Sequence, residues 1–299
     1  MAELLGKEAA LFVPSGTMAN LIAILAHTNP GDEVIMEKES HTFNYEAGGA
    51  AALAGIQINP LPGDRGILER EQIEAAIRMP NVHVPPTSLI CLENTHNRGG
   101  GAIYPLEKIK AISQLAKERQ LKMHLDGARL FNASVASGIS ADEYAKFFDS
   151  VMFCFSKGLG APIGSIIVGS KQFINKAHRY RKMLGGGMRQ VGILAAAANY
   201  ALDNNIDRLA VDHAHAKMLA TELAKIKGFN VQAEHVETNI IVFDVRESGY
   251  SVDEVLQKLR DNGILFIAFG PTLIRGVTSL EVSREDIERT IAVLHEIFG

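Results

Sequence analysis

Short apolar runs alternate with amphipathic helical stretches along the first two-thirds of the chain. The runs lie at residues 10–13, 33–36, 88–92, 122–125, 151–155 and 165–168. Their hydrophobicity is continuous and does not alternate with polar positions, which predicts strands covered on both faces, as in a parallel sheet between helices. A helix is predicted to begin beside Pro105, because the apolar residues that follow recur at helical spacing.

The last third has a different pattern, which predicts a smaller α+β domain after a long helix. Extended segments are predicted at residues 240–243, 264–269 and 273–277. Two further helices are expected to begin at Ser251 and Ser283, each followed three positions later by an acidic residue, as in a capping box. We therefore expect a large α/β domain at 1–204 and a small α+β domain at 205–299.

Composition excludes several classes of protein. The chain has 299 residues, 47% hydrophobic and 21% charged, with a formal charge of −4, which is typical of a globular protein. It has no basic stripe for nucleic acid and no apolar stretch of about 18 residues for a membrane span. Cys91 and Cys154 each lie in an apolar run, as buried thiols of a reducing compartment would, so we expect a cytoplasmic protein.

A strand, a tight turn and a helix start follow one another at residues 13–20. Backbone N–H groups at the helix start, with the Ser15 and Thr17 hydroxyls, could bind an anion. The alternative is an ordinary capped helix after a strand. The turn is not a P-loop, because it lacks the required lysine.

An acidic residue, Asp126, ends the predicted strand 122–125 and so lies at the carboxyl edge of the sheet, where α/β proteins bind ligands. Asp126 could hold a cationic ring nitrogen, and Arg129 could bind a carboxylate with two parallel hydrogen bonds. The alternative is a helix-capping aspartate with a local ion pair.

Lys157 follows another apolar strand and precedes a glycine-rich turn. A lysine shielded from water there can lose its proton and form a Schiff base; the alternative is a solvated lysine at a strand end. The glycines at 158, 160 and 164 have the wrong spacing for a dinucleotide fingerprint.

Two histidines, His41 and His96, each follow a predicted strand and could converge, one stacking on a ligand and one accepting a proton. The alternative is two loop histidines with structural partners. No paired ligand spacing supports a metal site. Two arginines complete the candidates: Arg189, expected to open a helix after three consecutive glycines, and Arg275, a lone charge in an apolar segment. A flexible loop and an ion pair at a domain interface are the respective alternatives.

The order of these features resembles that of fold-type-I pyridoxal-phosphate (PLP) enzymes with the aspartate-aminotransferase architecture. More specifically, the chain resembles the threonine aldolase and β-eliminating lyase family, in particular its low-specificity threonine aldolases. The resemblance covers almost the whole chain and is carried by residues 12–18, 40–41, 93–97, 124–129, 156–159 and 185–190. It implies retro-aldol cleavage of L-threonine and L-allo-threonine to glycine and an aldehyde.

The resemblance also implies roles for individual residues in holding PLP. Lys157 would carry the cofactor as a Schiff base, and Gly16 and Thr17 would bind its phosphate. His41 would stack on the pyridine ring, and Asp126 would keep the ring nitrogen protonated. The remaining cofactor-binding residues would be Ser156, Arg129 and Arg189, the last contributed either by the same chain or by a neighbouring subunit.

Substrate binding and assembly follow from the same resemblance. Arg129 and Arg275 would bind the substrate carboxylate, and Tyr45 would contact the substrate. His96 or His41, directly or through water, would take the proton of the β-hydroxyl. No metal is expected. The protein would be a homodimer or homotetramer with the site at the dimer interface.

The chain departs from the family pattern at its start. Members of the family carry several dozen further residues, including an Arg-Ser-Asp-Thr motif that approaches the site, whereas this chain opens with Ala2-Glu3-Leu4-Leu5-Gly6. We expect this departure to affect activity and assembly more than fold. Two rival functions stay open: another PLP reaction on the same scaffold, such as β-elimination, racemisation or decarboxylation, and cofactor or partner binding without turnover.

Overall fold

The computed structural model describes all residues from 1 to 299. The chain forms two compact units. The larger unit comprises Met1–Gly99 and Ile103–Ile206. The smaller comprises Gly100–Ala102 and Asp207–Gly299. The smaller unit thus also includes three residues from the middle of the chain, which the hydrophobic pattern did not assign to it. None of the helices combines the length and the apolar character needed to cross a lipid bilayer.

A seven-stranded sheet forms the centre of the larger unit, with the order β1-β7-β6-β5-β4-β2-β3. Its strands are β1 (Ala9–Val13), β2 (Glu33–Glu37), β3 (Gln57–Leu61), β4 (Thr87–Glu93), β5 (Lys122–Asp126), β6 (Ser150–Cys154) and β7 (Ser165–Gly169). Only β7 runs antiparallel to its neighbours, β1 and β6. The mainly parallel α/β sheet is as predicted. Strand β3 was not predicted, because the polar Gln57 and Asn59 and the adjacent Pro60 interrupt its apolar pattern.

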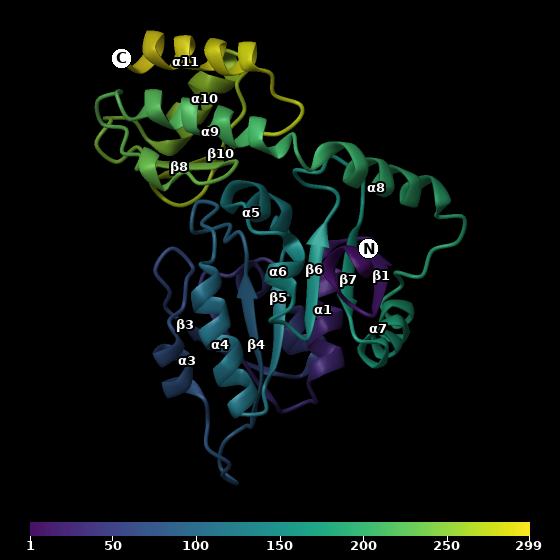
Figure 1. Cartoon of the computed structure of the whole chain (residues 1–299). Coiled ribbons are helices and arrows are strands. Elements are labelled where there is room, and N and C mark those ends of the chain that lie inside the picture. Colours follow the sequence, from purple (N-terminus) through teal and green to yellow (C-terminus); the bar gives the residue numbers. More distant parts are fainter. The chain divides into compact units, whose positions relative to one another are not determined.

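Helices cover both faces of this sheet (Figure 1). They are α1 (Gly16–His27), α2 (His41–Asn44), α3 (Arg70–Ala76), α4 (Leu106–Glu118), α5 (Leu130–Ser137), α6 (Ala141–Ala145), α7 (Lys171–Met183) and α8 (Gly192–Asn205). Side chains alternate along a strand, so His124 and Asp126 of β5 point to the face covered by α1, and both contact Asn20 of that helix. Met123 and Leu125 point to the opposite face.

The smaller unit is α+β. It contains the antiparallel strands β8 (Ile240–Asp244), β10 (Leu273–Val277) and β9 (Ile267–Ala268), in that order, with the helices α9 (Leu209–Leu223), α10 (Val252–Asp261) and α11 (Arg284–Phe298). The capping boxes predicted at Ser251 and Ser283 are both present. The long helix predicted before them is shorter than expected: it begins at Leu209, separately from α8, and ends at Leu223.

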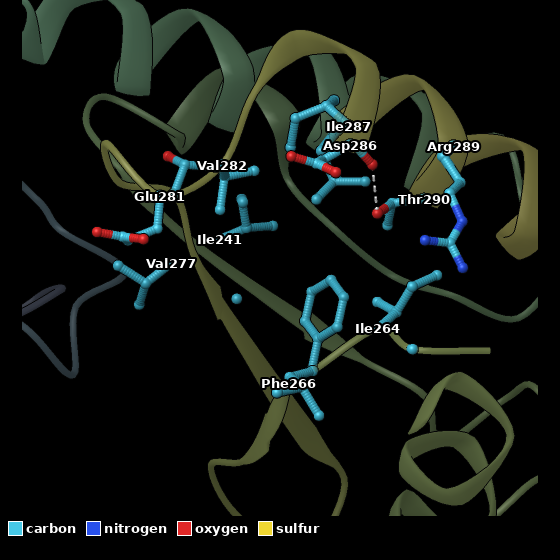
Figure 2. A pocket seen from close by; sticks show the side chains of 15 residues that line it. Ile241, Ile264, Phe266, Val277, Glu281, Val282, Asp286, Ile287, Arg289 and Thr290 are labelled. Atoms are coloured by element: carbon cyan, nitrogen blue, oxygen red, sulfur yellow. Dashed lines mark hydrogen bonds between the residues drawn. The ribbon is translucent and has the colours of Figure 1, made fainter. Parts of the chain in front are cut away.

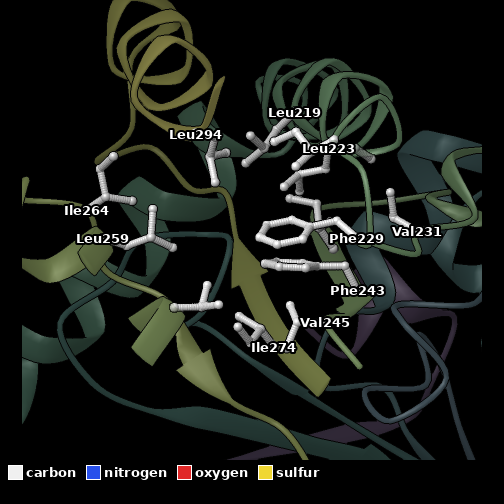
Figure 3. Close-up of a cluster of buried hydrophobic side chains, with 14 of the residues drawn as sticks. Leu219, Leu223, Phe229, Val231, Phe243, Val245, Leu259, Ile264, Ile274 and Leu294 are labelled. Carbon is white, nitrogen blue, oxygen red and sulfur yellow. The ribbon is translucent and has the colours of Figure 1, made fainter. Parts of the chain in front are cut away.

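Apolar side chains from α9, α10, α11 and the sheet pack together in the core of the smaller unit (Figure 3). At its centre the rings of Phe229 and Phe243 stack, with 5.5 Å between their centroids and 24° between their planes. Phe243 is 1% exposed, so its ring is fully enclosed by this core.

Removing the central ring should destabilise the protein. Phe243→Ala deletes a buried aromatic side chain and leaves a cavity, so we expect a loss of about 3–5 kcal/mol in the free energy of unfolding. Leu265→Ala in the same unit removes a side chain that is 79% exposed and should change stability by less than about 0.5 kcal/mol. Urea denaturation compares the two variants, and equal losses would contradict this packing.

A buried chain of polar side chains crosses the apolar layer between α1 and the large sheet. Asn20 Oδ1 lies 3.1 Å from His124 Nε2, His124 Nδ1 lies 2.8 Å from Ser150 Oγ, and Ser150 Oγ lies 2.8 Å from His27 Nε2. Burial lowers the pKa of His124 to about 4, so its imidazole is neutral at pH 7. Each of these side-chain atoms of Asn20, His124 and Ser150 thus has a hydrogen-bonding partner.

This depressed pKa makes stability depend on pH with a defined sign. In the unfolded chain His124 takes up a proton below pH 6.5, whereas the folded protein resists protonation down to about pH 4. Its contribution is therefore present above pH 6.5 and is lost as the pH falls, by roughly 3 kcal/mol in total. We expect His124→Gln to flatten the decline of unfolding free energy between pH 6.5 and 4. Replacing the exposed His83 by Gln should leave this decline unchanged. Identical slopes for wild type and His124→Gln would rule out this contribution.

Candidate active site

The carboxyl ends of six strands meet at one edge of the large sheet, because all of its strands except β7 run in the same direction. Most of the candidate residues predicted from the sequence follow these strand ends. Helix α1 begins after β1, His41 follows β2, and Glu93 ends β4. Asp126 ends β5 and Lys157 follows β6. This edge is where doubly wound α/β folds form ligand sites.

Asp126 is held by hydrogen bonds at the end of β5. It is 4% exposed, its Oδ2 accepts a hydrogen bond of 2.8 Å from Asn20 Nδ2, and its Oδ1 accepts one of 3.1 Å from the Ala128 amide. A buried carboxylate needs such donors to keep its charge.

A second buried carboxylate, Glu46, shares the same donor. Its Oε1 accepts a 2.8 Å hydrogen bond from Asn20 Nδ2 and lies 3.0 Å from His41 Nδ1. Burial raises the pKa of Glu46, the hydrogen bonds from His41 and Asn20 oppose that rise, and the charge of Asp126 adds to it. Sequence reasoning missed both Asn20 and Glu46. The available signal was Asn20, a polar residue on an otherwise apolar helix face.

His41 begins α2, and its position is fixed from two sides. Its amide donates to Glu93 Oε2 at 2.7 Å, while its ring is tilted against that of Tyr45, with 5.7 Å between the centroids. The hydrogen bond to Glu46 raises the pKa of His41 against the effect of burial; Asp126 also raises it and Lys157 lowers it. His41 therefore lies within electrostatic range of Asp126 and Lys157, two of the predicted cofactor-binding residues. Its side chain is 30% exposed.

His96 lies in a closed environment, unlike His41. It is 0% exposed, its Nδ1 accepts a 3.0 Å hydrogen bond from the Gly99 amide, and its Nε2 lies 3.2 Å from Glu37 Oε2. Burial disfavours the charged ring, but the carboxylates Glu93 and Glu37 outweigh burial and raise the pKa of His96. Both ring nitrogens are thus directed at groups of this chain, so the geometry favours His41 over His96 as the proton acceptor.

Lys157 is half-buried and Ser156 is exposed in the turn between β6 and β7. Burial raises the pKa of the neighbouring Cys154 thiol; Asp126 adds to this rise, and the cations Lys157 and Arg129 oppose it. Arg129 also lines a small cavity together with Cys154 and Gly158. The predicted Lys157, Asp126 and Arg129 therefore all lie within electrostatic range of one buried thiol.

The start of α1 packs tightly against β6. A Cβ atom added at Gly16 would come within 3.0 Å of Cys154 Sγ and 3.1 Å of Met152 Cε. Ser15 caps the helix by accepting a 3.2 Å hydrogen bond from the Met18 amide, and Thr17 is exposed. The close approach explains glycine at position 16 and leaves the first helical amides at the same sheet edge.

Two further predicted arginines belong to other segments of the chain. Arg189 is exposed in the segment between α7 and α8, and the expectation that it opens a helix was wrong, because α8 begins at Gly192. Arg275 belongs to the smaller unit, on β10, where its guanidinium lies 4.9 Å from the centroid of the Phe269 ring.

A cluster of possible ligand atoms and a cavity are two further features of the chain. The ligand atoms of His41, Glu46 and Asp126 lie within 4.8 Å of one another, and hydrogen bonds within the chain link the three residues directly or through Asn20. In the smaller unit, a cavity of about 360 Å³ has an apolar floor that includes Ile241 and Phe266 (Figure 2). Its rim residue Asp286 is engaged in the cap of α11.

Comparisons with known proteins show which family the chain belongs to. The family model described as β-eliminating lyase matches residues 1–247. The chain is 45% identical to low-specificity L-threonine aldolase 1 of Arabidopsis thaliana, over 99% of this chain and 84% of that protein. It is 43% identical to the low-specificity L-threonine aldolase of Escherichia coli K12, over 97% and 85%.

A solved structure supports the same fold. The threonine aldolase of Leishmania major superposes with a TM-score of 0.85 at 23% identity, over 99% of this chain and 86% of that one. The expected fold-type-I α/β architecture is thereby confirmed. Together with the family match over most of the chain, these similarities show that the protein belongs to the β-eliminating lyase family that includes the low-specificity threonine aldolases.

Proposed function

We propose that this protein is a PLP-dependent aldolase that cleaves L-threonine and L-allo-threonine to glycine and acetaldehyde. The observation that carries the proposal is the grouping of Asp126, His41 and Lys157 at one sheet edge, in a chain whose relatives are named threonine aldolases. The reaction breaks a Cα–Cβ bond. It needs an electron sink at Cα and a base at the β-hydroxyl.

The residues at this edge fit PLP in charge and chemistry. Asp126 is a buried carboxylate suited to a cationic ring nitrogen, and Lys157 is a half-buried amine suited to covalent attachment. The first amides of α1, at Gly16 and Thr17, suit a phosphate. When bound, PLP supplies the electron sink for the bond that breaks. Ser156, Arg129 and Arg189 stay predicted cofactor contacts.

His41 is the residue that we propose as the base for the β-hydroxyl proton. Its Nδ1 faces Glu46, so its Nε2 is the nitrogen left to accept a proton. Its pKa is raised by that same carboxylate, which strengthens it as a base. We propose that Arg129 binds the substrate carboxylate by two parallel hydrogen bonds. The roles of Arg275, His96 and Tyr45 toward the substrate stay predictions, as do the homodimer or homotetramer and the cytoplasmic location.

Replacing the proposed attachment residue should abolish the reaction. Lys157→Ala removes the only amine that we assign to the cofactor, so we expect threonine cleavage to fall by at least about 10³-fold, measured as acetaldehyde formed in the presence of PLP. Lys146→Ala removes an exposed lysine paired with Glu143 and should leave the rate unchanged. Unchanged turnover in Lys157→Ala would overturn the assignment.

Product analysis separates the aldolase from other PLP reactions. Incubation with L-threonine, L-allo-threonine, L-serine and β-phenylserine should yield glycine and the matching aldehyde from each substrate that reacts. A keto acid from threonine or serine would indicate β-elimination instead. Inverted substrate without glycine would indicate racemisation, and loss of carbon dioxide would indicate decarboxylation. Any of these as the main product would contradict the proposed aldolase.

A further inference from the structure

The amide of Asn20 has one orientation that satisfies all its neighbours. Its Nδ2 lies 2.8 Å from both Glu46 Oε1 and Asp126 Oδ2, and two carboxylates can only accept hydrogen bonds when ionised. Its Oδ1 then faces His124 Nε2 at 3.1 Å. Because an amide oxygen can only accept, the hydrogen of the neutral His124 ring lies on Nε2. The two carboxylates therefore fix Asn20 as a donor to both acids, and His124 donates to the remaining amide oxygen.

The two hydrogen bonds donated by Asn20 bring the buried carboxylates of Glu46 and Asp126 together beside the imidazole of His41. Glu46 is 6% exposed and Asp126 is 4% exposed, so little water screens their charges from each other. Glu46 Oε1 accepts from Asn20 while facing His41 Nδ1 at 3.0 Å. The other charged or titratable groups near His41 are Lys157, which opposes its protonation, Glu93, which binds its backbone amide, and Tyr45, whose ring contacts it.

We propose that Glu46 and Asn20 are positioning residues that couple the proton on His41 to the charge of Asp126. Glu46 accepts a hydrogen bond from Nδ1 of His41 and so orients the ring. Asn20 holds the carboxylates of Glu46 and Asp126 within electrostatic range of His41. The coupling has a direction. A cation that pairs with Asp126 withdraws negative charge from His41, which then binds its proton less tightly. This inference rests on the proposed function only where it assigns that cation to the cofactor ring.

The reciprocal effect follows from linkage between the two groups. Pairing Asp126 with a cation should favour neutral His41, and protonating His41 should weaken the binding of a cation at Asp126. In the proposed reaction, a cofactor ring paired with Asp126 would thus leave His41 neutral, which is the state that a base requires. Glu46 and Asn20 hold the two partners near each other, because Glu46 contacts His41 and shares the Asn20 amide with Asp126.

The test is a pH titration of the histidine rings by NMR in the full chain without added cofactor, with His41 assigned from a His41→Asn variant. We expect the pKa of His41 to lie above that of histidine in a model peptide. Glu46→Gln should lower the pKa of His41 by about one unit, since it removes the nearest negative charge, and Asp126→Asn should lower it by less. Glu33→Gln removes an equally buried carboxylate at the start of β2, paired with Arg78, and should leave His41 unchanged.

Several outcomes would overturn the coupling. An unchanged pKa of His41 in both Glu46→Gln and Asp126→Asn would do so, and so would an equal shift in Glu33→Gln. If Glu46→Gln does not fold, the wild type still decides. Ring ¹⁵N shifts must show hydrogen on Nδ1 of neutral His41, and a pKa of His41 at or below that of histidine in a model peptide would contradict the proposal.

A second readout uses the enzyme loaded with PLP. The acidic limb of the pH profile of kcat/KM for threonine cleavage should move to lower pH in Glu46→Gln, by the shift that NMR gives for His41. A limb that does not move would contradict the coupling. If the wild type cleaves no threonine, the proposed function fails, while the NMR titration still tests the coupling by itself.

Discussion

The burial of a carboxylate at the end of a central strand sets a requirement that much of the large unit meets. Asp126 is 4% exposed, and a charge so enclosed is stable only if hydrogen-bond donors replace water. Asn20 of α1 supplies one donor, and the backbone after β5 supplies another. Asn20 is held in turn by the neutral His124. A polar connection therefore fixes α1 relative to β5 across a layer that is otherwise apolar.

The same requirement organises the surrounding imidazoles. His41 and His96 each lie beside buried acids, but with opposite accessibility: His41 is partly exposed, whereas His96 is fully enclosed between Glu37 and Glu93. Glu93 also accepts the His41 backbone amide, so the enclosed histidine supports the position of the accessible one. The arrangement separates a rigid support from a side chain that a small molecule can reach.

Much of the fold could be predicted from the sequence, because fully covered strands read as continuous apolar runs and helix caps have local signatures. The capping boxes at Ser251 and Ser283 are examples. Strand β3 could not be predicted, since it lies at the edge of the sheet and carries polar residues and Pro60. The antiparallel direction of β7 depends on its pairing with β1 and β6, which no local pattern encodes.

The candidate site was predictable in outline only. Strand ends identified Asp126, His41 and Lys157, because parallel strands bring their carboxyl ends to one edge. Glu46 and Asn20 come from a loop and from the middle of a helix, and only the folded chain brings them to the same carboxylate. The burial of His96 likewise depends on distant residues such as Gly66, where an added Cβ would overlap the ring.

Chemical mapping of the bound cofactor tests most directly whether Lys157 is the residue that holds PLP. The full chain is incubated with PLP, reduced with borohydride to fix the cofactor on any amine that holds it, and digested for mass spectrometry. We expect a single pyridoxyl group on the peptide that contains Lys157, at close to one per chain. Labelling spread over exposed lysines such as Lys146 and Lys182, or absent from Lys157, would contradict it.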